Sequence, residues 1–302
     1  MSVRILSPGP LALVEDLGRP GHAHLGVSPS GARDRGARRL ANRLVGDEEG
    51  CAGLELLLGG FEARFESAAW FAVTGAVGSV RLDDRPIDRN SAQFAAVGSV
   101  LTIGAPVAGM RSYLAVRGGF AVPEVLGSRS HDQLSGLGPP PLTAGQVLPV
   151  GPRPAAEVPP LDFAPVADPP PEQDAVELRA SRGPRADWFT PAAQEAFFAV
   201  EWRLSPSSNR VGARLDPPRI PAHARRAESL PVPLLERSVP DELPSEPMVA
   251  GSVQVSPDGR PTVLLADHPV TGGYPVMAVV ASGSLDALAQ VRPGQRVRFR
   301  HA

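Results

Sequence analysis

The sequence predicts a mainly β protein of two domains, and three observations support this prediction. The chain has 302 residues, a length typical of about two domains. Proline (35) and glycine (31) together make up about a fifth of the chain, and such frequent turn formers suit many short strands better than long helices. Short apolar or alternating runs recur between these turns, as in an antiparallel sandwich or barrel.

In the first half, these runs predict a series of short strands. The clearest is residues 61–65, where Phe61, Ala63 and Phe65 alternate with charged residues, the pattern of a half-buried strand. The other expected strands are residues 11–14, 54–58, 70–74, 80–82, 93–97, 100–103 and 112–116.

One amphipathic helix is expected over residues 32–45. Its apolar side chains fall at helical spacing on one stripe, and Gly46 stands where a helix commonly ends. The stripe comprises Ala37, Leu40, Ala41, Leu44 and Val45. The opposite face carries arginines that we expect to be mostly solvated, namely Arg35, Arg38, Arg39 and Arg43.

Residues 152–171 contain eight prolines and no glycine, which favours a semi-rigid linker or a connection that follows an edge. We therefore expect a first domain over residues 1–151, a proline-rich linker over 152–173 and a second domain over 174–302. Within the second domain, prolines recur every few residues from 217 to 247, which predicts a long irregular excursion.

The second half repeats the mixture of short strands and short helices. Thr190 and Pro191 form a good N-cap and N1 pair for a helix to about residue 200. Ser284 is expected to cap another helix over residues 285–291. The expected strands are residues 176–180, 253–255, 262–266, 276–281 and 296–300.

The polar loop of residues 267–275 is the first functional candidate, because it lies between two apolar strands. It carries an acid, a histidine, a hydroxyl, a phenol and two adjacent glycines, and mobile polar loops on rigid elements often bind or react. The alternative is a wide hairpin whose glycines only serve turn geometry. A second polar loop, residues 127–132, has a solvated connection as its alternative.

Composition excludes several classes of site. Net charge is −2, so no basic footprint for nucleic acid is visible, and no apolar run of about 18 residues predicts a membrane span. The N-terminus lacks a signal pattern, so a cytoplasmic location is expected. All 30 basic residues are arginine, which excludes a Schiff-base or P-loop lysine. Cys51 is the only cysteine, and His22 and His24 lack a third ligand, so no metal is expected.

Several long motifs resemble one family throughout the chain. They occupy residues 15–34, 41–46, 113–130, 135–138, 205–215 and 253–275, in order. Together these motifs resemble the allophanate hydrolase subunit 2 family, also described as the biotin-dependent carboxyltransferase family. This family includes the C-type subunit of 5-oxoprolinase.

This resemblance implies a fold of two cyclophilin-like β-barrels and a companion chain of the subunit 1 or B type. It implies an ATP-dependent hydrolase, using ATP with Mg, that acts on a small cyclic amide such as 5-oxoproline. No covalent cofactor is expected in this chain. Arginines and backbone N–H groups can stabilise negative charge on an amide oxygen without lysine.

The resemblance also assigns candidate residues. The catalytic candidates are Asp267, Arg117 and Tyr274, with Asp267 as acid/base or orienting group. The substrate-binding candidates are Asp16, Arg19, Gly118, Gly119, Ser128, Arg129, Ser130, Asn209, Arg210, Gln254, Thr271, Gly272 and Gly273.

The sequence departs from the family at Glu15, where glutamine is expected, and at Pro269 and Val270, where glutamine and threonine are expected. Proline stiffens a loop and removes a donor, so a non-catalytic regulatory subunit that sequesters its partner is one alternative. Another is the carboxyltransferase component of a biotin-dependent urea or amide carboxylase, with biotin on a separate carrier because this chain lacks lysine. A prolyl isomerase is suggested by fold analogy alone.

Overall fold

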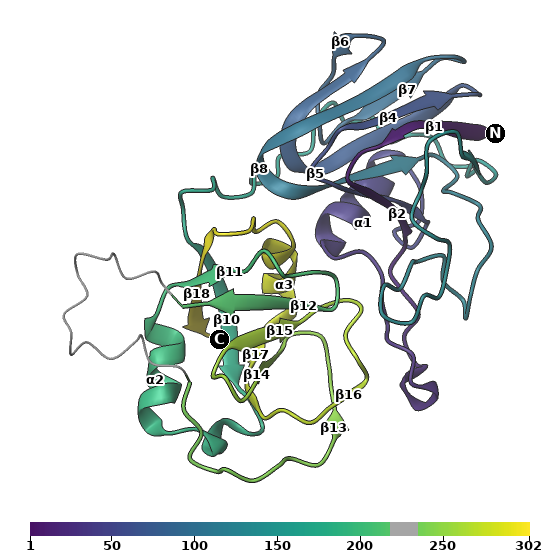
Figure 1. Ribbon diagram of the computed structural model, residues 1–302. Helices are drawn as coiled ribbons and strands as arrows, with labels where there is room; N and C mark the ends of the chain where they lie inside the picture. Colours follow the sequence, from purple (N-terminus) through teal and green to yellow (C-terminus); the bar gives the residue numbers. More distant parts are fainter. Residues whose placement is uncertain (218–234) are drawn as a thin grey trace. The chain divides into compact units, whose positions relative to one another are not determined.

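The structure is a computed structural model that describes residues 1–217 and 235–302 (Figure 1). The expected class, mainly β with a few short helices, is confirmed. The chain divides into two compact units, one of residues 1–22 and 29–171 and one of residues 23–28 and 172–302. His223 and most of the predicted excursion over residues 217–247 lie outside the described residues.

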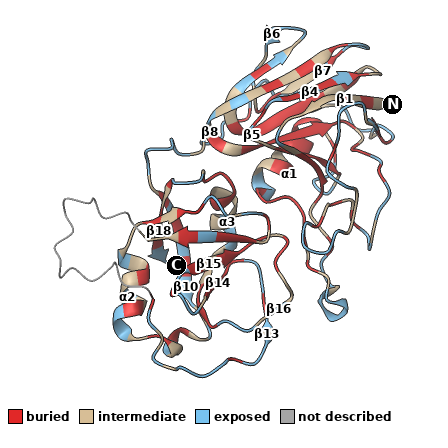
Figure 2. Cartoon of the chain, in the orientation of Figure 1, coloured by how far each residue is buried: buried red, intermediate tan, exposed pale blue. Residues whose placement is uncertain are grey.

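Unit 1 is built on a nine-stranded sheet in the order β2-β3-β8-β4-β1-β9, with β5 pairing β6, β7 and β8. Its strands are β1 (Ser2–Pro8), β2 (Leu11–Glu15), β3 (Gly53–Leu57), β4 (Phe61–Phe65), β5 (Ala69–Leu82), β6 (Arg85–Pro86), β7 (Ala92–Ala95), β8 (Val100–Val116) and β9 (Val147–Pro149). The predicted alternation in β4 is confirmed, with Phe61, Ala63 and Phe65 buried and the residues between them exposed (Figure 2).

Two pairs of expected short strands are in fact two long strands. β5 joins the runs predicted at 70–74 and 80–82, and β8 joins those at 100–103 and 112–116. The glycines and the proline between these runs suggested turns, but the paired strands absorb them through register shifts between Gly75 and Val80. Such bulges bend a strand without ending it.

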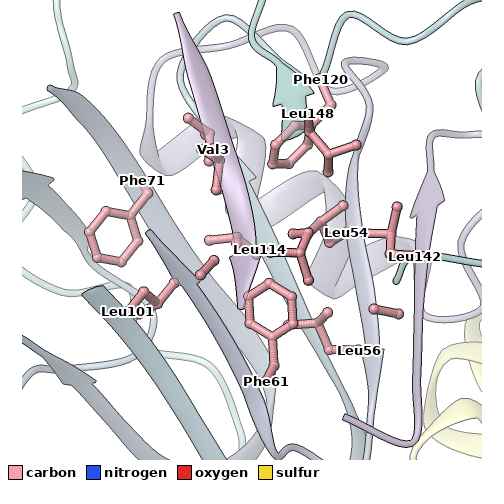
Figure 3. Close-up of a cluster of buried hydrophobic side chains, with 14 of the residues drawn as sticks. Val3, Leu54, Leu56, Phe61, Phe71, Leu101, Leu114, Phe120, Leu142 and Leu148 are labelled. Carbon is pink, nitrogen blue, oxygen red and sulfur yellow. The ribbon is translucent and has the colours of Figure 1, made fainter. Parts of the chain in front are cut away.

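The core of unit 1 is a cluster of buried apolar side chains gathered among these strands (Figure 3). Apolar side chains from β1, β3, β4 and β8 meet there, together with Leu148 of β9 and with Phe120 and Leu142 from the later loops. Burial of such side chains stabilises the unit by about 1.5–3 kcal/mol each.

Helix α1 (Arg35–Leu44) begins three residues later than expected, because Asp34 is its N-cap and accepts a hydrogen bond from the Ala37 N–H. The predicted stripe packs as expected, since Ala41, Leu44 and Val45 are buried. The expectation of a solvated arginine face is wrong for Arg38, which is fully buried.

Residues 152–171, expected to be a linker, run along unit 1. Ala164 is buried against α1, and its N–H donates to the Asn90 carbonyl. Arg89 pairs with Asp168 at 2.8 Å. The segment therefore packs on unit 1 through these contacts.

Unit 2 is a closed barrel in the order β10-β17-β14-β15-β12-β11-β18. Its strands are β10 (Val176–Arg182), β11 (Trp202–Leu204), β12 (Gly212–Asp216), β14 (Ser252–Val255), β15 (Pro261–Leu264), β17 (Val276–Val280) and β18 (Arg296–His301). A two-stranded sheet of β13 (Glu246–Pro247) and β16 (Thr271–Gly272) lies outside the barrel order.

Two α-helices accompany the barrel. Helix α2 (Pro191–Ala199) begins as predicted, with the Thr190 hydroxyl accepting from the Ala193 N–H, and it buries Phe197 in the barrel core. Helix α3 (Ser282–Ala289) begins before the predicted cap, and the Ser284 hydroxyl instead accepts from the Arg179 N–H. The unit therefore uses Ser284 to join α3 to β10.

Candidate functional site

The polar loop of unit 2 connects β15 to β17 and contains β16. Its start is buried: Asp267 is 0% exposed and His268 is 2% exposed. Its tip is open, since Thr271 and Gly273 are exposed and Tyr274 is 47% exposed. The loop is thus divided into a buried anchor and a solvent-facing tip.

The anchor is an ion pair between Arg210 and Asp267. The Arg210 Nε lies 2.8 Å from Asp267 Oδ2, and its Nη2 lies 3.1 Å from Oδ1, a two-bond fork. The Asp267 N–H also donates to the Arg210 carbonyl. A carboxylate held in this way by a buried guanidinium fixes the start of the loop in place.

Gln254 holds the other end of the loop. Its side-chain amide donates to the Tyr274 carbonyl at 3.1 Å, and the residue is buried on β14. A Cβ added to Gly272 would lie 2.5 Å from the Gln254 Nε2, so a larger residue there would have to displace this amide. Thr271, Gly273 and Tyr274 are therefore presented between two fixed points.

Asn209 shapes the turn that carries Arg210. Its Oδ1 accepts from the Val211 and Gly212 N–H groups, at 2.9 and 3.2 Å, and so closes the turn before β12. In this arrangement Asn209 aims Arg210 at Asp267.

A second group of predicted residues gathers on Asp16 in unit 1. The carboxylate accepts hydrogen bonds from the Ser128 and Ser130 hydroxyls, each at 2.6 Å, from the Arg129 N–H at 2.6 Å and from the Gly18 N–H at 2.7 Å. The solvated connection considered for residues 127–132 is wrong, because Ser128, Ser130 and Asp132 are fully buried. These residues form a neutral cradle around a carboxylate of the same chain.

Arg19 borders this cradle and is 2% exposed. Its guanidinium donates to the carbonyls of Val125 and Ser130, while Nη1 has no hydrogen-bond partner among the residues the structure describes. The predicted Asp16, Arg19 and Ser128–Ser130 set is therefore brought together within unit 1.

The third group surrounds Arg117, whose guanidinium donates to the carbonyls of Val45, Pro154 and Ala156. The arginine expected to act on substrate thus holds α1 to the proline-rich segment.

Gly118, next in the chain, donates its N–H to both carboxylate oxygens of Asp47, at 2.9 and 3.0 Å. Burial raises the pKa of Asp47, against the smaller opposing effects of this hydrogen bond and of Arg117. Gly118 and Gly119 have φ of +102° and +66°, conformations that favour glycine.

Sequence reasoning missed a buried cluster on β3 and β8. Glu55 Oε2 accepts from the Tyr113 hydroxyl and the Arg33 N–H, each at 2.9 Å, and Arg111 lies 3.3 Å from Oε1. Burial raises the pKa of Tyr113 well above its ordinary value. The available signal was a lone charge inside the otherwise apolar run of residues 54–58.

Arg38 was also missed. It donates to the carbonyls of Glu15 and Cys51 and to Asn42 Oδ1. Burial lowers the pKa of its guanidinium to about 10.

Across residues 1–217 and 235–302, no three His, Cys, Asp or Glu side chains form a group that could hold a metal ion. The same described residues include no helix with the length and apolarity needed to cross a membrane.

Comparisons with known proteins give consistent results. The family described as "Carboxyltransferase domain, subdomain A and B" matches residues 25–301. The C-type subunit of 5-oxoprolinase from Escherichia coli is 36% identical, over 98% of this chain and 90% of that protein. The solved urea amidolyase of K. lactis superimposes with a TM-score of 0.88 at 29% identity, and this chain spans 18% of it. The structure of TTHA0988 gives a TM-score of 0.83 at 34% identity, with this chain spanning 55% of it.

Proposed function

Because the chain belongs to the carboxyltransferase subdomain A and B family, as its motifs predict, we propose that it is the C-type subunit of a 5-oxoprolinase. In this proposal it works in the cytoplasm as part of a hetero-oligomer with a B-type companion chain. The assembly opens a small cyclic amide, 5-oxoproline, in a reaction driven by ATP.

The observation that carries the proposal is the extent of the match to the 5-oxoprolinase relative. The match spans 90% of the Escherichia coli protein, whereas the chain spans 18% of the K. lactis urea amidolyase. A fold alone hosts many activities, so the near-complete correspondence with one relative carries more weight than the barrel.

The loop tip of unit 2 is the part of this chain that we assign to the amide. Thr271 and Tyr274 offer a hydroxyl and a phenol to solvent, while Arg210 and Gln254 fix the loop from behind. Fixed donors stabilise negative charge on an amide oxygen better than free ones, because they need no reorganisation. We therefore give Arg210, Asp267 and Gln254 positioning roles and Thr271 and Tyr274 contact roles.

ATP and Mg enter the proposal only through the assembled complex. The described residues provide no cluster of metal-ligating side chains, and the sequence has no lysine for a P-loop. We therefore derive no step through ATP on this chain.

The test is ATP turnover by the purified complex of this chain with its companion chains. We expect turnover that depends on 5-oxoproline. Tyr274→Phe and Thr271→Ala should each lower kcat/KM by about 10-fold or more, the effect of losing one hydrogen bond to a charge that develops in the reaction. Thr143→Ala, at an exposed threonine of unit 1, is the matched control and should leave turnover unchanged.

Carboxyl transfer is the second candidate, favoured by the TM-score of 0.88 to urea amidolyase. It requires a biotin carrier on another chain, because this chain has no lysine to biotinylate. Carboxylation of urea by the complex in the presence of a biotinylated carrier, without 5-oxoproline turnover, would select it. A tight complex with neither activity would favour the regulatory alternative.

A further inference from the structure

A cavity opens at one end of the barrel of unit 2. Strands β10 and β18 are parallel, so their carboxyl ends lie at the same edge. Side chains alternate along a strand, and the inward row of β10, through Leu178 and Ala180, ends at Arg182. The inward row of β18, through Phe299, ends at His301. Barrel mouths are common places for small ligands.

Helix α2 forms the opposite wall of this cavity. Figure 1 shows α2 beside β18, and the two elements are in contact. The cavity has a volume of about 300 Å³ and is lined by Arg182, Gln194, Glu195, Phe198, Ala199 and His301. His301 stacks on Phe198, with ring centroids 3.8 Å apart and planes inclined by 25°. The Phe198–His301 stack therefore gives the cavity an aromatic side.

The charges in the cavity differ from those on the outside of the same strands. Outward-facing Arg298 pairs with Glu201, and Arg300 pairs with Glu177 at 2.8 Å. Arg182 and Glu195 line the same cavity, yet neither forms an ion pair with any residue in the described part of the chain. A guanidinium and a carboxylate that line one cavity without pairing can bind the two charged ends of a zwitterion.

We propose that this cavity binds a small α-amino acid. Arg182 holds the carboxylate through its donor fork, and Glu195 accepts from the ammonium group. The amino acid side chain lies on the Phe198–His301 stack. The site is separate from the loop tip assigned to the amide, and the proposal does not depend on the identity of the reaction.

The test is calorimetric titration of the whole chain with L-leucine and L-phenylalanine. These probes avoid L-glutamate, which is the expected product of 5-oxoproline opening. We expect saturable binding of at least one probe. Leucinamide lacks the carboxylate and N-acetylleucine lacks the ammonium group, so each should bind about 10- to 100-fold more weakly than L-leucine.

Variants identify the cavity as the site. Arg182→Gln should weaken L-leucine binding by about 10- to 100-fold without changing the affinity for leucinamide. Glu195→Gln should weaken L-leucine binding by a similar factor without changing the affinity for N-acetylleucine. Both side chains are exposed, so both variants should fold. Arg300→Gln, on the outward face of β18, should leave binding unchanged. Absence of binding by both probes, or L-leucine binding that Arg182→Gln leaves unchanged, would overturn the proposal.

Discussion

Asp16 in unit 1 and Asp267 in unit 2 are both buried carboxylates, and each fixes a polar loop in a different way. Asp16 is surrounded by neutral donors, namely two serine hydroxyls and two backbone N–H groups. Asp267 faces a guanidinium that matches both of its oxygens. The first arrangement uses short-range hydrogen bonds alone, while the second combines them with a buried charge pair.

The difference concerns what remains when one partner is lost. A hydroxyl removed from Asp16 leaves three donors in place, so the loss is partial. The guanidinium removed from Asp267 takes away the opposite charge, and a buried charge without its counterpart is costly. We therefore expect the unit 2 loop to depend on one residue and the unit 1 loop to depend on several.

The largest effect should come from Arg210→Ala, which should lower the free energy of unfolding of unit 2 by about 3–5 kcal/mol. Urea denaturation followed by tryptophan fluorescence in a Trp70→Phe background measures it, because Trp188 and Trp202 then report unit 2 alone. The double variant Arg210→Met with Asp267→Leu removes both charges and should recover much of the loss. Equal instability of the single and double variants would show that charge is not the cause.

Asp16→Ala should have the next largest effect, lowering the free energy of unfolding by about 2–3 kcal/mol, because the buried donors then lack their acceptor. Ser128→Ala should cost only about 1 kcal/mol. Hydrogen exchange of the β2 and β8 amides reports both variants. A Ser128→Ala effect as large as that of Asp16→Ala would contradict the shared cradle.

Gly118→Ala tests whether backbone shape also holds unit 1. A Cβ there would lie 2.6 Å from the Gly151 carbonyl oxygen. Gly98→Ala is the matched control, because Gly98 has φ of +88° but no atom within 4 Å of the added Cβ. We expect thermal denaturation to show about 1–2 kcal/mol more destabilisation for Gly118→Ala than for the control. Equal losses of stability in the two variants would mean that the positive φ, and not the contact with the Gly151 carbonyl, causes the destabilisation.

The smallest effect concerns a third buried carboxylate, Asp47, whose pKa is raised chiefly by burial. A raised pKa means that the folded state binds the proton more tightly than the unfolded state. The resulting stabilisation is present below the ordinary value of 3.8 and is lost as pH rises through the folded pKa. The unfolding free energy of wild type minus that of Asp47→Asn should therefore fall across this window. A rise of this difference with pH would contradict burial as the main influence on the Asp47 pKa.

The parts of the fold governed by local patterns were predictable. The alternation in β4 and the Thr190–Pro191 start of α2 depend on neighbouring residues, and both are present. The continuity of β5 and β8 was not predictable, because Gly75, Gly104 and Pro106 resemble turn residues until their pairing partners are known. Bulges are set by the facing strand and leave little local signal.

The candidate residues show the same limit. The motifs identified residues that do cluster, such as Asp16 with Ser128 and Ser130, but not whether they face solvent. Arg38 lies on a helix face rich in arginine, and its acceptors come from β2 and from the loop before β3. The contrast between buried anchor and open tip in residues 267–275 likewise depends on Arg210 and Gln254, which are distant in sequence.

The position of β18 has a consequence for synthesis of the protein on the ribosome. This strand lies between β10 and β11 and closes the barrel, although its residues follow every other strand of unit 2. In the nascent barrel, β10 and β11 therefore each keep one unpaired edge until residues 296–301 have left the exit tunnel. Unit 1, whose last strand ends at Pro149, can complete its sheet much earlier, so unit 2 is the part of the nascent chain that most needs protection from aggregation.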